Sequence, residues 1–131
     1  MRNPQKDIFE KTVSNKKTGN FGEVVAALYL RLKGYKILER NFSVKGGELD
    51  IIAEKKNTVI IVEVKTRTNT DFGAPEDAVN LFKKRNIIFA AKKYLKYRGR
   101  ENMKVRFDVI SIILKPFKIK HIKDAFICDD V

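Results

Sequence analysis

The chain has 131 residues, 44% of them hydrophobic, and carries 28 lysines and arginines against 16 acidic residues, a net charge of +12. This length predicts a single globular domain, and the charge favours a polyanionic partner, with nucleic acid expected first. With no run of about eighteen apolar residues and no apolar N-terminal segment, we expect a cytoplasmic protein with neither a membrane span nor a signal peptide; a lone Cys128 excludes an internal disulfide and a zinc–cysteine cluster.

The N-terminal part of the chain predicts a tail followed by a helix. Residues 1–17 are polar and basic and predict a tail or a short helix, ahead of one domain over residues 18–127 and a C-terminal tail over 128–131. Asn20, with Glu23 three residues later, forms a capping-box pattern that predicts the helix start. Gly34 is expected to end this helix. Its apolar face is predicted from helical spacing, at Phe21, Val24, Val25, Leu28 and Leu32.

Three apolar segments then predict an antiparallel meander. They are residues 35–42, 49–53 and 59–64. A turn over residues 43–47, which contains two glycines, connects the first segment to the second. The last two runs are almost continuously apolar, which predicts strands covered on both faces. If Lys56-Asn57 forms a two-residue turn, Asp50 lies directly across from Glu63 on the same face of the sheet.

Directly opposed like charges destabilise a sheet, so a positive group is expected between Asp50 and Glu63. Lys65 points to the same face, because strand side chains alternate, and is one candidate. A divalent cation that prefers carboxylate oxygens is the other. The simpler alternative is an exposed ladder of ion pairs, but the apolar residues around these acids argue against it.

A second long helix is predicted after a polar loop over residues 68–74, which is suited to substrate contacts. Pro75 is expected at its first position and Gly99 at its end. Its buried stripe is predicted to comprise Ala78, Leu81, Phe82, Ile88, Ala91 and Leu95. Among its many basic residues, Lys83, Lys84 and Arg85 are the candidates for phosphate contacts, whereas the basic residues from Lys92 onward are assigned to a solvated face. Tyr94 and Tyr97 could stack on bases, although packing is the commoner role.

The C-terminal part predicts two further strands. Residues 105–113 form a strongly apolar run, and its Asp108 is expected to pair with Arg106 or another base and is not assigned to a metal. Residues 119–126 predict an edge strand with His121, for which a packing or surface role is expected, since no serine or cysteine nucleophile accompanies it. The order of elements predicts an α/β fold with a mixed central sheet and helices packed against it.

Asp50, a hairpin and then Glu63-Val64-Lys65 resemble the PD-(D/E)xK nuclease core of type II restriction enzymes and archaeal Holliday-junction resolvases, with Leu49 where that motif has proline. The chain resembles more closely the YraN family of uncharacterised bacterial proteins, over about residues 19–127. This resemblance rests on an ordered set of short segments: Gly19-Asn20-Phe21-Gly22-Glu23 with Ala26 and Tyr29-Leu30, residues 34–38 with Asn41, residues 47–52, residues 62–67, Ala78-Val79 with Lys83, Ala90-Ala91, Tyr94-Leu95, residues 106–109 and Ala125-Phe126.

The resemblance implies a restriction-endonuclease-like fold and a metal-dependent endonuclease that hydrolyses DNA, structured or junction DNA included. Asp50, Glu63 and the Val64 carbonyl would hold Mg²⁺ or Mn²⁺, and Lys65 would orient the attacking water or neutralise charge in the transition state. Glu23 could bind a second ion or a metal-bound water, or could only close the helix cap. The remaining implied residues are Glu48, outside the direct metal ligands, and the nucleic-acid contacts Arg67, Lys83, Lys84 and Arg85.

Two other functions stay open from the sequence. The chain could be a nucleic-acid-binding module that keeps the nuclease fold without turnover, or a protein-interaction domain whose positive charge is incidental. Junction cutting would additionally require a homodimer, because two incisions need two active sites.

Overall fold

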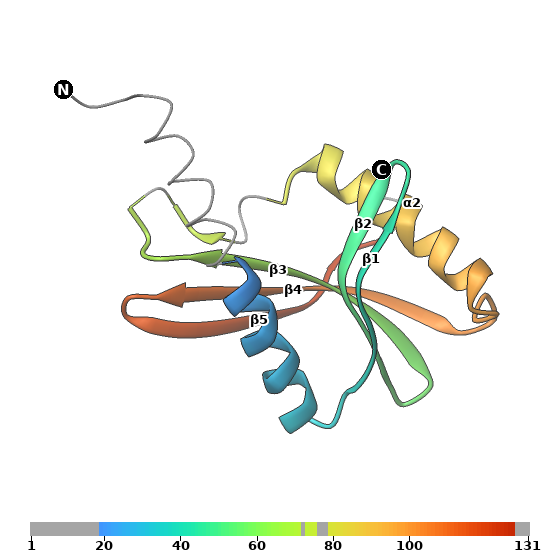
Figure 1. The fold of residues 1–131 in the computed structure, drawn as a ribbon, viewed down its shortest axis with the longest axis horizontal. Coiled ribbons are helices and arrows are strands. Elements are labelled where there is room, and N and C mark those ends of the chain that lie inside the picture. The colour runs from blue at the N-terminus through green and yellow to red at the C-terminus, as the bar shows by residue number, and fades with distance from the viewer. Residues whose placement is uncertain (1–18, 72, 76–78, 128–131) are drawn as a thin grey trace.

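The computed structural model of the protein describes residues 19–71, 73–75 and 79–127. The tails predicted over residues 1–17 and 128–131, with Cys128, lie outside these residues. The described residues form one sheet of five strands in the order β1-β2-β3-β4-β5 (Figure 1). The strands are β1 Lys36–Val44, β2 Gly47–Lys55, β3 Thr58–Arg67, β4 Lys104–Leu114 and β5 Phe117–Phe126.

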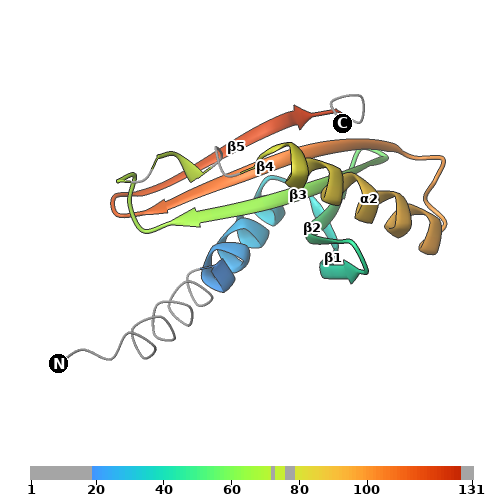
Figure 2. The same cartoon turned by 90° about the horizontal axis from the view of Figure 1, so that it is seen from above.

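The sheet is mixed, as the sequence predicts. β3 and β4 run parallel, whereas the β1–β2, β2–β3 and β4–β5 pairs are antiparallel. The parallel pair is joined through α2 (Leu81–Tyr97), because a parallel connection needs a crossover of this length. A helix that includes residues 19–32, called here the first helix and drawn in blue in Figures 1 and 2, precedes β1. The predicted α/β architecture is confirmed.

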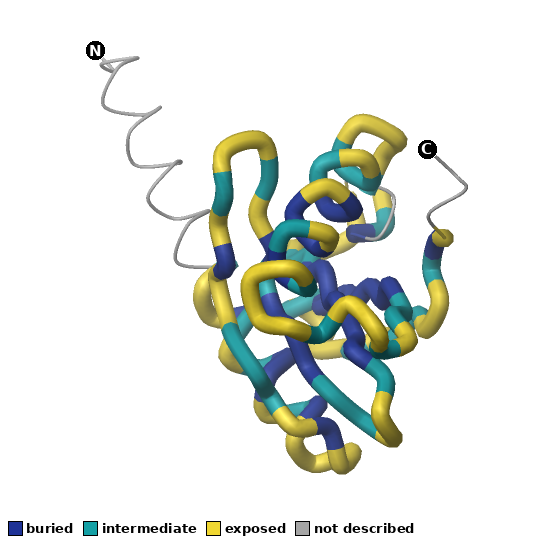
Figure 3. The backbone as a smooth tube through the Cα atoms, turned by 90° about the vertical axis from the view of Figure 1, so that its right-hand side faces the viewer, coloured by how far each residue is buried: buried dark blue, intermediate teal, exposed yellow. Residues whose placement is uncertain are grey.

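The two helices cover opposite faces of the sheet. Along β3, Val59 and Ile61 belong to the core under α2, and Ile60 and Val62 belong to the core under the first helix. All four side chains are at most 2% exposed. The buried part of the tube in Figure 3 accordingly follows the central strands. The continuous apolar run of β3 is therefore explained by burial on both faces, as predicted.

The first helix differs from its prediction in two respects. Gly19 and Asn20 are already helical, so the predicted cap at Asn20 is wrong. The predicted apolar face is also wrong, because the helix packs through Ala26, Ala27 and Leu30. Most residues of the predicted stripe are exposed instead: Phe21 by 53%, Val24 by 46%, Leu28 by 53% and Leu32 by 87%.

Small side chains explain why this helix face was missed. Alanines let the helix backbone approach the sheet closely, and Gly22 has no room for a Cβ atom because that atom would collide with Oγ1 of Thr66 on β3. The predicted end at Gly34 is confirmed: its φ is +89°, and the amide of Tyr35 donates a 2.9 Å hydrogen bond to the Leu30 carbonyl.

The helix α2 begins later than predicted. It starts at Leu81 instead of Pro75, and Asn80 is its N-cap, accepting a 2.9 Å hydrogen bond from the amide of Lys83. The predicted end at Gly99 is confirmed by a φ of +65° and by a 2.9 Å hydrogen bond from the Arg100 amide to the Leu95 carbonyl.

The buried face of α2 is only partly as predicted. Ile88 and Ala91 are buried, but the predicted Leu81 and Phe82 are 49% and 73% exposed, because the first turn of α2 borders a cleft described below. The predicted Ala78 lies outside the described residues. The buried side chains that the prediction omitted are Ile87, Ala90 and Tyr94. Tyr94 packs edge-on against Phe42 at 5.3 Å between ring centroids, so its role is packing.

A glycine also brings α2 close to the β1–β2 hairpin. β1 extends to Val44, so the turn is shorter than predicted and centres on Gly46, whose φ is +99°. A Cβ atom at Gly47 would collide with the backbone oxygen of Asn86 on α2. Gly47 therefore fixes the distance between hairpin and helix.

No helix in the described residues is long and apolar enough to cross a membrane.

Candidate active site

Asp50 and Glu63 face each other across the β2–β3 hairpin. The turn residues Lys56 and Asn57 have positive φ values of 51° and 60°, as a type I′ turn requires, which confirms the predicted turn. Continued along the two strands, the pairing register sets Asp50 opposite Glu63. Side chains at opposite positions of an antiparallel pair share one face of the sheet. The hairpin therefore brings the two predicted carboxylates together.

Two lysine side chains contact the Glu63 carboxylate. Lys65 follows two residues later on β3, and Lys83 comes from the first turn of α2; the Nζ atom of each lies 3.4 Å from Glu63 Oε1. The prediction that Lys65 shares a face with Glu63 is confirmed. Lys83 is predicted to contact a phosphate, and the structure places it beside the acidic pair, where its Nζ atom contacts Glu63.

Burial makes this cluster electrostatically unusual. The Glu63 side chain is 3% exposed. Desolvation, followed by the charge of Asp50, raises the pKa of Glu63 to about 7 although Lys83 and Lys65 oppose the shift. Desolvation also raises the pKa of Asp50, against the hydrogen bond from Val64 and the two lysines. A carboxylate that is hard to ionise in the protein alone gains strongly from an added cation.

Val64 contacts Asp50 through its backbone. Its amide donates a 2.9 Å hydrogen bond to Oδ2 of Asp50. In a strand, the N–H and C=O groups of one residue face the same neighbouring strand. The Val64 carbonyl therefore also faces β2, the strand that carries Asp50.

Glu23 approaches the pair from the first helix. Its carboxylate lies 3.9 Å from Nη2 of Arg40 on β1. Desolvation, then the charge of Asp50, raises the Glu23 pKa, while Arg40 lowers it. The contact of Gly22 with Thr66 holds this helix turn against β3. Because Asn20 is not the N-cap, the capping role considered for Glu23 no longer applies, and its position near Asp50 needs another explanation.

Hard cations prefer oxygen ligands, and the site offers the carboxylates of Asp50 and Glu63 with that of Glu23 beside them. Among the residues that the structure describes, however, no group of three or more histidine, cysteine, aspartate and glutamate side chains is arranged to hold a metal ion. Two carboxylates and retained waters suffice for Mg²⁺, which seldom has an all-protein ligand set. The oxygen donors present therefore fit a Mg²⁺ or Mn²⁺ site that is completed by water or substrate.

Glu48 lies two residues before Asp50 on β2, and its charge contributes, as the smallest of the causes, to the raised pKa of Glu23. It pairs with Ser43 across the β1–β2 hairpin and is exposed. Together with Lys83 it lines a cleft of about 430 Å³ between this hairpin and α2. The cleft is not predictable from local sequence patterns, because it forms between elements that are far apart in the chain.

The other predicted nucleic-acid contacts lie around the cluster in different environments. Arg67 is exposed at the end of β3. Lys84 places its Nζ atom 5.6 Å from the centre of the Phe126 ring, while Arg85 is exposed on α2. Arg67 and Arg85 are thus open to solvent, and Lys84 also packs on an aromatic ring.

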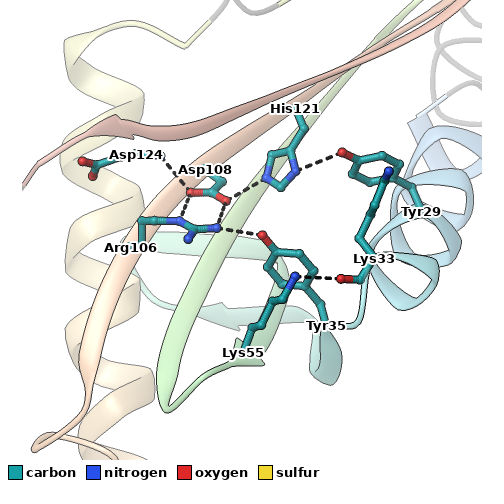
Figure 4. A network of polar contacts seen from close by, with 8 residues as sticks. All are labelled: Tyr29, Lys33, Tyr35, Lys55, Arg106, Asp108, His121 and Asp124. Atoms are coloured by element: carbon teal, nitrogen blue, oxygen red, sulfur yellow. Dashed lines mark hydrogen bonds and ion pairs between the residues drawn. The ribbon is translucent and has the colours of Figure 1, made fainter.

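A second polar network lies under the first helix (Figure 4). Asp108 is fully buried and accepts hydrogen bonds of 2.8 and 2.7 Å from Arg106, which confirms the predicted pair. His121 Nε2 lies 2.7 Å from Asp108 Oδ2, and His121 Nδ1 lies 3.3 Å from the Tyr29 hydroxyl. Arg106 also donates to the Tyr35 hydroxyl at 2.9 Å. The network joins β4, β5 and the first helix, and no sequence pattern predicts the part that the two tyrosines take in it.

Comparison with known proteins gives a family but no activity. The model of the family described as "Uncharacterised protein family UPF0102" matches residues 22–112. A UPF0102 protein of Caldanaerobacter subterraneus is 45% identical over 88% of this chain and 99% of its own length. A UPF0102 protein of Syntrophomonas wolfei is 50% identical over 86% of this chain and 99% of its own length. A third, from Clostridium beijerinckii, is 47% identical over 86% of this chain and 94% of its own length.

Proposed function

The chain belongs to the uncharacterised protein family UPF0102, and we propose that it is a metal-dependent endonuclease that hydrolyses phosphodiester bonds of DNA. One observation carries the proposal: Asp50, Glu63 and Lys65 lie in one largely buried cluster, with Lys65 Nζ 3.4 Å from Glu63 Oε1. This is the grouping that the resemblance to the PD-(D/E)xK core implies for Asp50, Glu63 and Lys65. The net charge of +12 supports a polyanionic substrate.

In the proposed reaction the carboxylates of Asp50 and Glu63 would hold the metal ion, and Glu23 would be nearby for a second ion or a metal-bound water. A bound Mg²⁺ or Mn²⁺ supplies Lewis-acid polarisation of the phosphate and a lower pKa for a bound water. Lys65 donates hydrogen bonds that orient the attacking water or stabilise charge on the phosphate in the transition state. Lys83 is held at Glu63 and is placed to share the negative charge of the scissile phosphate.

The direct test is cleavage of supercoiled, linear, single-stranded and four-way-junction DNA with Mg²⁺ or Mn²⁺. We expect Asp50→Asn, Glu63→Gln and Lys65→Ala each to lower cleavage by at least about a hundredfold, the effect of losing one strong transition-state contact. Glu54→Gln, a substitution in β2 opposite Val59 and away from the cluster, is the matched control and should cleave as the unaltered protein does. Cleavage that persists in all three cluster variants would contradict the proposal.

A nucleic-acid-binding module without turnover is the second candidate. The observation that favours it is the charge balance at Glu63, where Lys65 and Lys83 already provide two positive groups without a metal ion. Salt-sensitive DNA binding, with no cleavage of any substrate and no effect of Mg²⁺ or Mn²⁺, would favour this module over the enzyme.

A further inference from the structure

The cleft beside the acidic cluster has the size and chemistry of a nucleotide-base site. Its volume is about 430 Å³, within the range of roughly 300–1,000 Å³ typical of small-molecule pockets. One wall is the β1–β2 hairpin, with Ser43, Gly47 and Glu48, and the other is the start of α2, with Phe82, Lys83 and Asn86. The two elements approach closely at Gly47, where an added Cβ atom would collide with the backbone oxygen of Asn86.

Lys83 connects the cleft to the proposed active site. It lines the cleft, and its Nζ atom lies 3.4 Å from Glu63 Oε1. Its side chain is 27% exposed, so Lys83 is not enclosed by the protein. A phosphate next to Lys83 would therefore lie beside the cleft, and the group attached to that phosphate would extend into it.

Phe82 provides an exposed aromatic surface on the cleft wall. The sequence pattern places it on the buried stripe of α2, yet it is 73% exposed. Exposed aromatic rings next to basic residues are the usual platforms on which unpaired bases stack. Asn86, with an amide that can donate and accept, is placed to contact a base edge.

Glu48 determines which part of a nucleotide would occupy the cleft. Its carboxylate repels a phosphate group but accepts hydrogen bonds from the amino groups of bases. Lys83 stands on the opposite wall and attracts phosphate. The arrangement thus favours a base inside the cleft and its phosphate beside Lys83.

We propose that this cleft binds one unpaired base adjacent to the scissile phosphate, so that the substrate is DNA with a single-stranded or extruded nucleotide. This inference rests on the proposed nuclease function and specifies its substrate class. A base in an intact duplex is paired and stacked, and taking it out costs a few kcal/mol, so blunt duplex is a poor ligand for the cleft.

The test is binding by fluorescence anisotropy in EDTA, where no cleavage occurs, to a labelled single strand, a duplex with a single-stranded flap and a blunt duplex at one salt concentration. We expect Phe82→Ala to weaken binding of the single strand and the flap about tenfold, with less than about a twofold effect on blunt duplex. Phe82→Trp should restore the preference. Phe117→Ala removes a ring that is 58% exposed at the start of β5, outside the cleft, and serves as the matched control.

The base site would be overturned by unchanged binding of the single strand by Phe82→Ala, or by an equal loss on single strand and blunt duplex. A loss of the same size in Phe117→Ala would also overturn it, because the effect would then be general to exposed rings.

Failure of the nuclease proposal would give a different result. If the unaltered protein cleaves nothing with Mg²⁺ or Mn²⁺ while Phe82→Ala still loses the single-strand preference, the base site is supported and only the enzymatic activity is excluded.

Discussion

The residue with the clearest conflict between stability and proposed function is Glu63. It is 3% exposed and lies opposite another carboxylate, and burial raises its pKa to about 7. A buried carboxylate at this position does not stabilise the fold. Two lysines reduce the cost of the charge without removing it, and this residual cost is what a bound cation would relieve.

Glu63→Gln is therefore expected to remove a pH-dependent loss of stability in the metal-free protein. The unfolded chain ionises Glu63 near pH 4.5 and the native protein near pH 7. A raised native pKa contributes stability that is present below the unfolded value and lost as pH rises through the native value, here a few kcal/mol. Urea unfolding in EDTA should show that the free energy of unfolding of the unaltered protein falls between pH 5 and pH 8. In Glu63→Gln it should fall much less over the same range.

The matched control for this prediction is Glu39→Gln, which changes an acid on β1 that is 30% exposed and pairs with Arg98. The effect of Glu39→Gln on the free energy of unfolding should be similar at pH 5 and at pH 8. An unchanged pH slope in Glu63→Gln would contradict the origin given for the destabilisation.

Asp108 is expected to show the opposite pH dependence. Burial opposes its ionisation, but hydrogen bonds from His121 and Arg106 outweigh burial and lower its pKa from 3.8 to about 2. A lowered native pKa gives stability that is present above the unfolded value and lost as pH falls toward 2, about 2 kcal/mol in total. Asp108→Asn should be several kcal/mol less stable at pH 6, because Arg106 loses its partner. Urea unfolding should show this difference narrowing toward pH 2, and a constant difference would contradict the prediction.

Among the elements, the strands follow from the sequence and the helix faces do not. The two long apolar runs and the Lys56-Asn57 turn suffice to predict the hairpin and the opposition of Asp50 to Glu63, because register in a two-residue hairpin is set by the turn. The pair of Arg106 with Asp108 is equally local, since both lie on one face of one strand.

The contacts that the sequence does not predict join distant elements. Lys83 on α2 contacts Glu63 on β3, and Tyr29 on the first helix contacts His121 on β5, so both contacts depend on how each helix packs on the sheet. The buried face of the first helix differs from its prediction for a related reason. Large apolar residues dominate a periodicity argument, whereas the close packing seen at Ala26 and Ala27 depends on small ones.

A pair of leucines on the first helix tests this packing. Leu30 is fully buried, and Leu32 is 87% exposed. We expect Leu30→Ala to lower the free energy of unfolding by about 2–5 kcal/mol, the range for buried leucines. Leu32→Ala should change it by less than about 0.5 kcal/mol, as is usual for exposed positions. Chemical denaturation of both variants checks the assignment, and equal losses would mean that the helix packs through the stripe expected from periodicity.

At the scale of the whole molecule, the net charge of +12 predicts DNA binding that weakens steeply with salt. Each phosphate neutralised by a lysine or arginine releases counterions, so the logarithm of the affinity should fall linearly with the logarithm of salt concentration. Arg85→Gln removes an exposed cation on α2 and should lower the magnitude of this slope by about one. Lys104→Gln is the control, because Lys104 lies opposite Thr58 at the end of the sheet away from Glu63 and should leave the slope unchanged. Equal slopes for the unaltered protein and both variants would mean that Arg85 contacts no phosphate, and affinity independent of salt would mean that the positive charge is incidental to function.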